Sequence, residues 1–149
     1  MAETVAVLGA GTMGRGIAEV AAIAGHTVQL YDPDAEALSK AIKVIAFNLQ
    51  KSAEAGRLTE SADVVAARVR PTGQLEACAK ADLVIEAAPE ILEVKQDLLG
   101  KLGALNPSNL LATNTSTLCI SAIAARVKNP ERVVGLHFFN PAQRMKLWR

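Results

Sequence analysis

The stretch TVAVLGAGTMGRGIAEVAAIAGHTVQLYD, residues 4–32, carries the strongest information about the fold. Thr4–Leu8 is apolar and rich in β-branched residues, which predicts a strand buried on both faces. Thr12–Ala24 has small and apolar residues at helical spacing and ends at Gly25, a residue type that commonly terminates helices. Thr27–Tyr31 is again apolar and β-prone. We therefore predict a strand, helix, strand unit of typical length.

The same alternation of strands and helices continues along the chain. Helical periodicity predicts four further helices at Ala35–Ala55, Ser61–Ala67, Ile91–Leu105 and Ser121–Val127. Apolar runs predict a short edge strand at Arg68–Arg70 and buried strands at Asp82–Glu86, Leu110–Asn114 and Val133–Phe138. Such alternation predicts an α/β fold with a doubly wound, mainly parallel sheet and helices on both faces. We expect residues 1–149 to form one domain.

A glycine-rich loop lies between the first predicted strand and helix. Its six residues are Gly9, Ala10, Gly11, Thr12, Met13 and Gly14, which match the pattern GxGxxG. In this context Gly9 permits a tight turn, Gly11 lets the backbone approach a pyrophosphate, and Gly14 allows close packing of helix on strand. The helix N-terminus offers free amides to phosphates. The loop predicts a Rossmann-type dinucleotide site, and the alternative is a tight turn without a ligand.

Asp32 follows the second predicted strand, about twenty residues beyond the glycines, where a carboxylate accepts both hydroxyls of an adenosine ribose. At about 4 Å and an effective dielectric near 20, its charge would repel a 2′-phosphate by about 4 kcal/mol. NAD is therefore the expected cofactor rather than NADP. The alternative is that Asp32 only caps the turn beside Pro33.

Composition excludes several classes of protein. The chain has 149 residues, half of them hydrophobic, and a formal net charge of +1 from 16 basic and 15 acidic residues. This balance gives no field that would attract nucleic acid or an anionic membrane. Cys78 and Cys119 have no disulfide or metal-ligand spacing, which is typical of a reduced, cytoplasmic protein without a metal site. No signal or membrane-spanning segment is evident, so we expect a soluble protein.

Polar residues follow the later strands, at the sheet edge where such folds bind ligands. His137 is the candidate general base, because an imidazole exchanges protons near neutral pH. The alternative for His137 is a core histidine between Leu136 and Phe138. The other histidine, His26, is expected to be solvent-exposed in a turn.

Further polar residues near this edge have both a functional and a structural interpretation. Ser116 could bond a substrate oxygen, and Asn140 could hold the nicotinamide or its ribose. Asn114, Thr115 and Ser116 precede a predicted helix, however, and such residues often cap helices instead. Lys95 could reach the cofactor or could simply be solvated. The residues alone leave these alternatives open.

The combination of five motifs is more specific than any of them alone. The segments VAVLGAGTMGRGIAEVAA, LYD, ADLVIEAAPE, ATNTSTLCISAIA and GLHFFNPA resemble the N-terminal domain of 3-hydroxyacyl-CoA dehydrogenases. The resemblance runs from Thr4 to Leu147, and NTST and GLHFFNP are its most diagnostic parts. Within the family, the chain resembles bacterial 3-hydroxybutyryl-CoA and phenylacetate-pathway 3-hydroxyadipyl-CoA dehydrogenases.

The resemblance implies roles for particular residues. Those implied to contact NAD are Asp32, Glu90, Lys95, Ser116 and Asn140. His137 is implied to take the proton of the 3-hydroxyl, and Ser116 also to touch the acyl-CoA substrate. The family also binds CoA partly through the helical excursion after the second strand, where Lys51 is the substrate-binding candidate and Arg57 a weaker one. The product would be a 3-ketoacyl-CoA, formed in fatty acid or aromatic acid degradation.

The end of the chain departs from the family pattern. Arg149 stands where the family has a glutamate that pairs with the catalytic histidine, and the helical substrate and dimerisation domain does not follow. We therefore expect a cofactor-binding piece of a dehydrogenase with little or no turnover by itself.

The alternatives are a stand-alone, non-catalytic NAD-binding module and a purely structural protein like the related lens crystallins. Apolar surface is expected around Phe138, Phe139, Leu147 and Trp148, where it could support a homo-oligomer.

Overall fold

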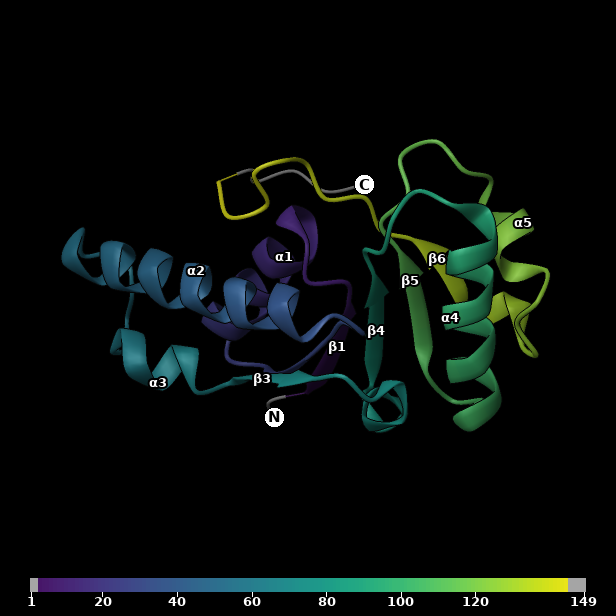
Figure 1. The fold of residues 1–149 in the computed structure, drawn as a ribbon, viewed down its shortest axis with the longest axis horizontal. Coiled ribbons are helices and arrows are strands. Elements are labelled where there is room, and N and C mark those ends of the chain that lie inside the picture. The colour runs from purple at the N-terminus through teal and green to yellow at the C-terminus, as the bar shows by residue number, and fades with distance from the viewer. Residues whose placement is uncertain (1–2, 145–149) are drawn as a thin grey trace.

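The computed structural model describes residues 3–144, which form a parallel sheet covered by helices (Figure 1). Its strands are β1 (Thr4–Leu8), β2 (Thr27–Tyr31), β3 (Val69–Thr72), β4 (Leu83–Glu86), β5 (Leu110–Thr113) and β6 (Val133–Gly135). Their order is β3-β2-β1-β4-β5-β6, and neighbouring strands are parallel. Because β2 and β4 flank β1, the direction of winding reverses beside β1. This strand order and the parallel pairing confirm the predicted fold class. In doubly wound sheets, ligands bind at the carboxyl edge where the winding reverses.

Helices cover both faces of the sheet. The helices are α1 (Thr12–Ile23), α2 (Ala35–Glu54), α3 (Ala62–Ala66), α4 (Leu92–Leu105) and α5 (Ile120–Ala124), with short 3-10 helices η1 (Leu75–Lys80) and η2 (Pro130–Arg132). Figure 1 shows α1 and α2 on one side of the sheet and α4 and α5 on the other. Along β1, Val5 and Val7 pack in the core under α1 and α2, whereas Ala6 and Leu8 pack under α4 and α5. This alternation is the two-sided burial expected for a central parallel strand.

The longest helix, α2, begins at a capped N-terminus and has one apolar stripe. The Asp34 carboxylate accepts hydrogen bonds from the amides of Glu36 and Ala37 at 2.8 and 3.3 Å. Its buried residues are Leu38, Ala41, Ile45 and Leu49, which recur at helical spacing. The helix therefore packs along α1 and carries its remaining side chains toward solvent.

Two strands end at least two residues away from their predicted ends, and the other differences in strand boundaries are of one residue. β6 ends at Gly135, not at Phe138, because its partner β5 ends at Thr113, which lies opposite Gly135. His137 consequently lies in a loop. The edge strand β3 continues through Pro71 to Thr72, since a strand paired on one side tolerates a residue without an amide hydrogen. The 3-10 helix η1 was not predicted.

The expectation that His26 is solvent-exposed is wrong. Its side chain is half-buried, and within residues 3–144 its Nδ1 atom is buried without a hydrogen-bond partner. The ring lies beside the C-terminal end of α1 and lines an apolar cavity of about 400 Å³, together with Leu136 and Phe138. Phe138 and Phe139 are themselves half-buried rather than exposed, and Phe138 packs against the core under α1.

Candidate functional site

The glycine loop forms a tight turn between β1 and α1. Gly9 has φ +107°, in the left-handed region that glycine favours, and a Cβ there would lie 2.6 Å from the Ala87 carbonyl oxygen. A Cβ at Gly14 would overlap the carbonyl oxygen of Gly9. At Gly11, by contrast, a Cβ would meet nothing within 4 Å among the described residues. Gly9 and Gly14 are therefore required by packing, whereas Gly11 borders open space.

Asp32 connects the glycine loop to the start of α2. One carboxylate oxygen accepts a hydrogen bond from the Ala10 amide at 2.8 Å, and the other accepts from the Asp34 amide at 2.9 Å. The second bond is the turn-capping role considered above, and the first ties Asp32 to the glycine loop as well. A carboxylate has about four acceptor positions, so Asp32 retains capacity for ribose hydroxyls.

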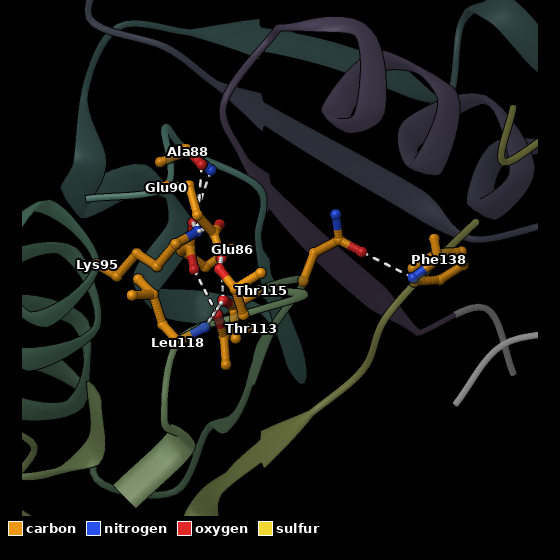
Figure 2. Close-up of polar contacts among 10 residues, drawn as sticks. Glu86, Ala88, Glu90, Lys95, Thr113, Thr115, Leu118 and Phe138 are labelled. Carbon is orange, nitrogen blue, oxygen red and sulfur yellow. Dashed lines mark hydrogen bonds and ion pairs between the residues drawn. The ribbon is translucent and has the colours of Figure 1, made fainter. Parts of the chain in front are cut away.

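A buried polar network joins the carboxyl ends of β4 and β5 (Figure 2). Glu86 and Lys95 are 0% and 1% exposed, so the alternative that Lys95 is solvated is wrong, and its ammonium lies 2.8 Å from Glu86 Oε1. The Ala88 amide donates to the same oxygen at 2.6 Å, and the Thr113 hydroxyl donates to Glu86 Oε2 at 2.6 Å. The buried carboxylate is therefore paired and hydrogen-bonded, as burial of a charge requires.

Glu90 extends this network toward the surface. Its carboxylate lies 3.3 Å from the Lys95 ammonium and accepts hydrogen bonds from the hydroxyls of Thr115 and Thr117. Partial burial alone would raise the pKa of Glu90, but the Thr115 and Lys95 interactions outweigh it and lower the pKa to about 2. Glu90 is therefore an anion at every physiological pH.

Ser116 lies on the exposed loop between Thr115 and Thr117. The capping alternative is wrong for this loop, because α5 begins at Ile120 and its N-cap residue is Cys119. The Thr115 hydroxyl instead accepts a hydrogen bond from the Leu118 amide at 3.0 Å, which closes a turn around Ser116. The Ser116 hydroxyl is thus presented at the edge of the sheet.

His137 and Asn140 lie on the loop that follows β6. The Asn114 side-chain oxygen accepts a hydrogen bond from the Phe138 amide at 2.7 Å, which ties this loop to the end of β5 (Figure 2). His137 is half-buried and its ring packs against Phe139, with the ring centroids 5.1 Å apart. Asn140 is exposed.

Lys51 and Arg57 lie apart from these groups, at the far end of α2 and in the turn that follows. Both line a polar cavity of about 510 Å³ between α1, α2 and residues 141–144. Lys51 forms an exposed ion pair with Glu54 at 3.2 Å and lies 5.8 Å from the centre of the Phe47 ring. Arg144 also lines this cavity, so cations reach it from two segments of the chain.

The fold thus gathers the predicted residues into three groups. The glycine loop and Asp32 form the first, beside β1 and β2. Glu90, Lys95 and Ser116 form the second, at the ends of β4 and β5, and the loop with His137 and Asn140 is tied to it through Asn114. Lys51 stands in the third, the α2 cavity.

Two structural residues were not assigned roles from the sequence. Glu86 was predicted only as the last residue of a strand, although it is the centre of the buried network. Glu19 is buried in α1 and accepts hydrogen bonds from Asn48 at 2.9 Å and from Gln143 at 3.2 Å. Burial raises the pKa of the Glu19 carboxyl, and the two amide hydrogen bonds oppose that shift. An acidic residue within the apolar helix pattern was the available signal.

The remaining sequence-based predictions concern residues 147–149, metal binding, membrane-spanning segments and the cysteines. Leu147, Trp148 and Arg149 lie outside the described residues. Within residues 3–144 there is no group of three or more histidine, cysteine or acidic side chains placed to hold a metal ion. In the same range, none of the helices has the length and apolar character needed to cross a bilayer. Both cysteines are free thiols, Cys78 buried and Cys119 exposed.

Comparison with known proteins identifies relatives along almost the whole chain. Residues 4–148 match the family model of the 3-hydroxyacyl-CoA dehydrogenase NAD-binding domain. The chain is 56% identical over 147 residues to 3-hydroxyadipyl-CoA dehydrogenase of Escherichia coli K12, covering 97% of this chain and 31% of that protein. It is 41% identical to 3-hydroxybutyryl-CoA dehydrogenase of Bradyrhizobium diazoefficiens, over 97% of this chain and 50% of that protein.

Solved structures agree with these matches. The crystal structure of 3-hydroxybutyryl-CoA dehydrogenase from Escherichia coli K12 superposes with a TM-score of 0.94 at 55% identity, covering 99% of this chain and 32% of that one. The chain therefore spans about a third to a half of the length of these relatives. The match of residues 4–148 shows that this chain belongs to the 3-hydroxyacyl-CoA dehydrogenase family, as its NAD-binding domain.

Proposed function

We propose that this chain is the cofactor-binding part of an NAD-dependent (S)-3-hydroxyacyl-CoA dehydrogenase, which oxidises a 3-hydroxyacyl-CoA to a 3-ketoacyl-CoA. The observation that carries the proposal is the convergence of the glycine loop, Asp32 and the Glu86–Lys95–Glu90 network on the carboxyl edge of one sheet. The open space at Gly11 and the acidic side chain of Asp32 fit a diphosphate and an adenosine ribose, respectively.

Each residue in the proposed mechanism has a separate task. Bound NAD supplies the hydride acceptor of the reaction. His137 takes the proton of the substrate 3-hydroxyl as hydride leaves C3, the carbon that bears this hydroxyl. Ser116 donates a hydrogen bond to the same oxygen, and Asn140 orients the nicotinamide end of the site. The exposed position of Ser116 and the half-buried His137 ring support this division of roles.

The substrate side of the proposal concerns coenzyme A. The cavity lined by Lys51, Arg57 and Arg144 offers three cations to a polyanionic ligand. Replacing Lys51 and Arg57 with glutamine should weaken binding of CoA, and most at low salt, because screening removes this attraction. Fluorescence or calorimetric titration at two salt concentrations measures the effect. If the variant and the unchanged chain bound CoA with equal affinity at both salt concentrations, this would contradict CoA binding in this cavity.

The first test of the proposed function is a calorimetric titration of the chain with NAD and with NADP. We expect NAD-selective binding, because the Asp32 carboxylate repels a 2′-phosphate. An absorbance assay for NADH with 3-hydroxybutyryl-CoA and 3-hydroxyadipyl-CoA then separates the remaining possibilities. Binding without turnover supports a cofactor domain that needs further polypeptide for catalysis, and absence of NAD binding contradicts the proposal.

A homo-oligomeric state and a cytoplasmic location remain predictions. The named relatives act on 3-hydroxyadipyl-CoA and 3-hydroxybutyryl-CoA, so both acyl groups belong in the assay. Sedimentation velocity measures the oligomeric state directly.

A further inference from the structure

The buried carboxylate of Glu86 makes three contacts that fix different parts of the molecule (Figure 2). Its contact with the Ala88 amide at 2.6 Å shapes the loop after β4, and its contact with Thr113 at 2.6 Å joins the end of β5. Its ion pair with Lys95 at 2.8 Å reaches the second turn of α4. Glu86 therefore holds together one loop, one strand and one helix.

Lys95 connects Glu86 to Glu90, which lies nearer the surface. Its ammonium contacts Glu86 Oε1 at 2.8 Å, the Ala88 carbonyl oxygen at 3.2 Å and Glu90 Oε2 at 3.3 Å. An ammonium has three hydrogens, so these three acceptors match its full donor capacity. With 1% of the side chain exposed, the Lys95 charge is directed at these groups inside the protein.

Glu90 passes the constraint to the loop after β5. Its other carboxylate oxygen accepts from the hydroxyls of Thr115 and Thr117, the two neighbours of Ser116. A chain of contacts therefore leads from buried Glu86 through Lys95 and Glu90 to both sides of Ser116. A loop bound on both sides of one residue has little freedom to move that residue.

We propose that Glu86 is a positioning residue that fixes the Ser116 loop, and with it the half of the cofactor site that receives the nicotinamide nucleotide. This inference rests on the proposed binding of NAD. In a doubly wound fold each half of the sheet binds one mononucleotide. The glycine loop and Asp32 lie on the β1-β2-β3 half, whereas Glu86 and Ser116 lie on the β4-β5-β6 half.

Because the two halves of the sheet bind different parts of NAD, comparing NAD affinity with ADP affinity distinguishes a positioning role of Glu86 from a general loss of structure. ADP contains the adenosine and the diphosphate but lacks the nicotinamide nucleoside, so it reports on the glycine loop and Asp32 alone. In Glu86→Gln we expect NAD affinity to fall roughly tenfold, the loss of one hydrogen-bonded charge contact. ADP affinity should stay within about twofold of the unchanged chain. Calorimetry measures both.

Asn109→Leu is the matched control. Asn109 is buried just before β5, at the opposite end of that strand from Ser116, and its side-chain amide donates to the carbonyl oxygens of Ala79 and Ala81 at 3.3 and 3.0 Å. The variant therefore removes buried hydrogen bonds from the same half of the sheet but leaves the path from Glu86 to Ser116 in place. We expect NAD and ADP affinities within about twofold of the unchanged chain. A tenfold loss of NAD affinity in this variant would overturn the assignment, because it would show that any disturbance of this half of the sheet has the same effect.

Thr115→Val tests the other end of the path and does not disturb the buried pair. It should reproduce the selective loss of NAD affinity, and combined with Glu86→Gln the two losses should not add, because both variants break one path. This variant decides the question if circular dichroism shows that Glu86→Gln does not fold.

The inference is overturned by unchanged NAD affinity in Thr115→Val, or by equal losses for NAD and ADP. Failure of the unchanged chain to bind either nucleotide would instead contradict the proposed function itself.

Discussion

Single residues of the glycine loop are constrained for different reasons, which two alanine variants separate. In Gly14→Ala the new methyl group overlaps the Gly9 carbonyl oxygen, so the chain should be severely destabilised. In Gly11→Ala the methyl group meets nothing within 4 Å, so the unfolding free energy should change by no more than about 1 kcal/mol. NAD affinity of Gly11→Ala should nevertheless fall at least roughly tenfold, because the methyl group occupies the space for the diphosphate.

Urea denaturation and NAD titration of both variants check this prediction. Retention of full NAD affinity by Gly11→Ala would show that the diphosphate does not approach this residue.

Buried Glu19 makes a prediction about pH. Burial raises its pKa above 4.5, so the folded state binds the proton more tightly than the unfolded state does. The tighter proton binding by Glu19 stabilises the folded state fully below pH 4.5, and this stabilisation is lost as the pH rises through the pKa of the folded state. Glu19→Gln keeps an oxygen that accepts from Asn48 and Gln143 but cannot ionise, so it should raise the unfolding free energy at neutral pH.

The gain should vanish below pH 4.5, where the natural carboxyl is also neutral. Urea denaturation over a pH series measures it. Glu54→Gln, on the exposed face of neighbouring α2, controls for the loss of one negative charge. An equal gain in both variants would show that net charge, not burial, is the cause.

At the scale of elements, the N-terminus of α2 depends on one side chain. Asp34 accepts hydrogen bonds from two amides of the first turn, so Asp34→Ala should lower the unfolding free energy by about 1 kcal/mol. Asp34→Asn keeps an acceptor oxygen and should cost less than half of that, about 0.5 kcal/mol or below. Thermal or urea denaturation compares the two. Equal losses would mean that the charge, rather than the hydrogen bonds, stabilises the start of this helix.

Elements were also where sequence-based prediction was most and least accurate. The predicted core of each strand and helix is confirmed, because hydrophobic periodicity is a property of near neighbours. The end of β6 was wrong by three residues, since it is set by where β5 stops rather than by the β-propensity of residues 136–138. The residue at which a partner strand ends is not encoded in the local sequence.

At the scale of the whole molecule, the acid side of the stability curve should depend on Glu90. The pKa of Glu90 is about 2 in the folded state, below the ordinary value of 4.5. Its contribution is therefore fully present above 4.5 and is lost as pH falls toward 2. Glu90→Gln should be less stable than the unchanged chain at neutral pH, and this difference should shrink progressively through that interval.

Acid titration followed by circular dichroism measures the difference. Glu131→Gln, at an exposed position in η2, controls for removal of one surface carboxylate. A difference between Glu90→Gln and the unchanged chain that does not vary with pH would contradict the network at the ends of β4 and β5.

The doubly wound fold and the glycine loop could be predicted from the sequence alone, and so could the position of Asp32 as the acid proposed to select NAD, because turns, periodicity and motif spacing are local properties. The family resemblance added His137, Ser116 and Asn140 as candidates. Only the tertiary structure decided which groups meet. Glu86 and Thr113 are 27 residues apart, and Glu19 and Gln143 are 124 residues apart. Burial and hydrogen bonding between such distant residues follow from strand order and helix packing, which no local pattern specifies.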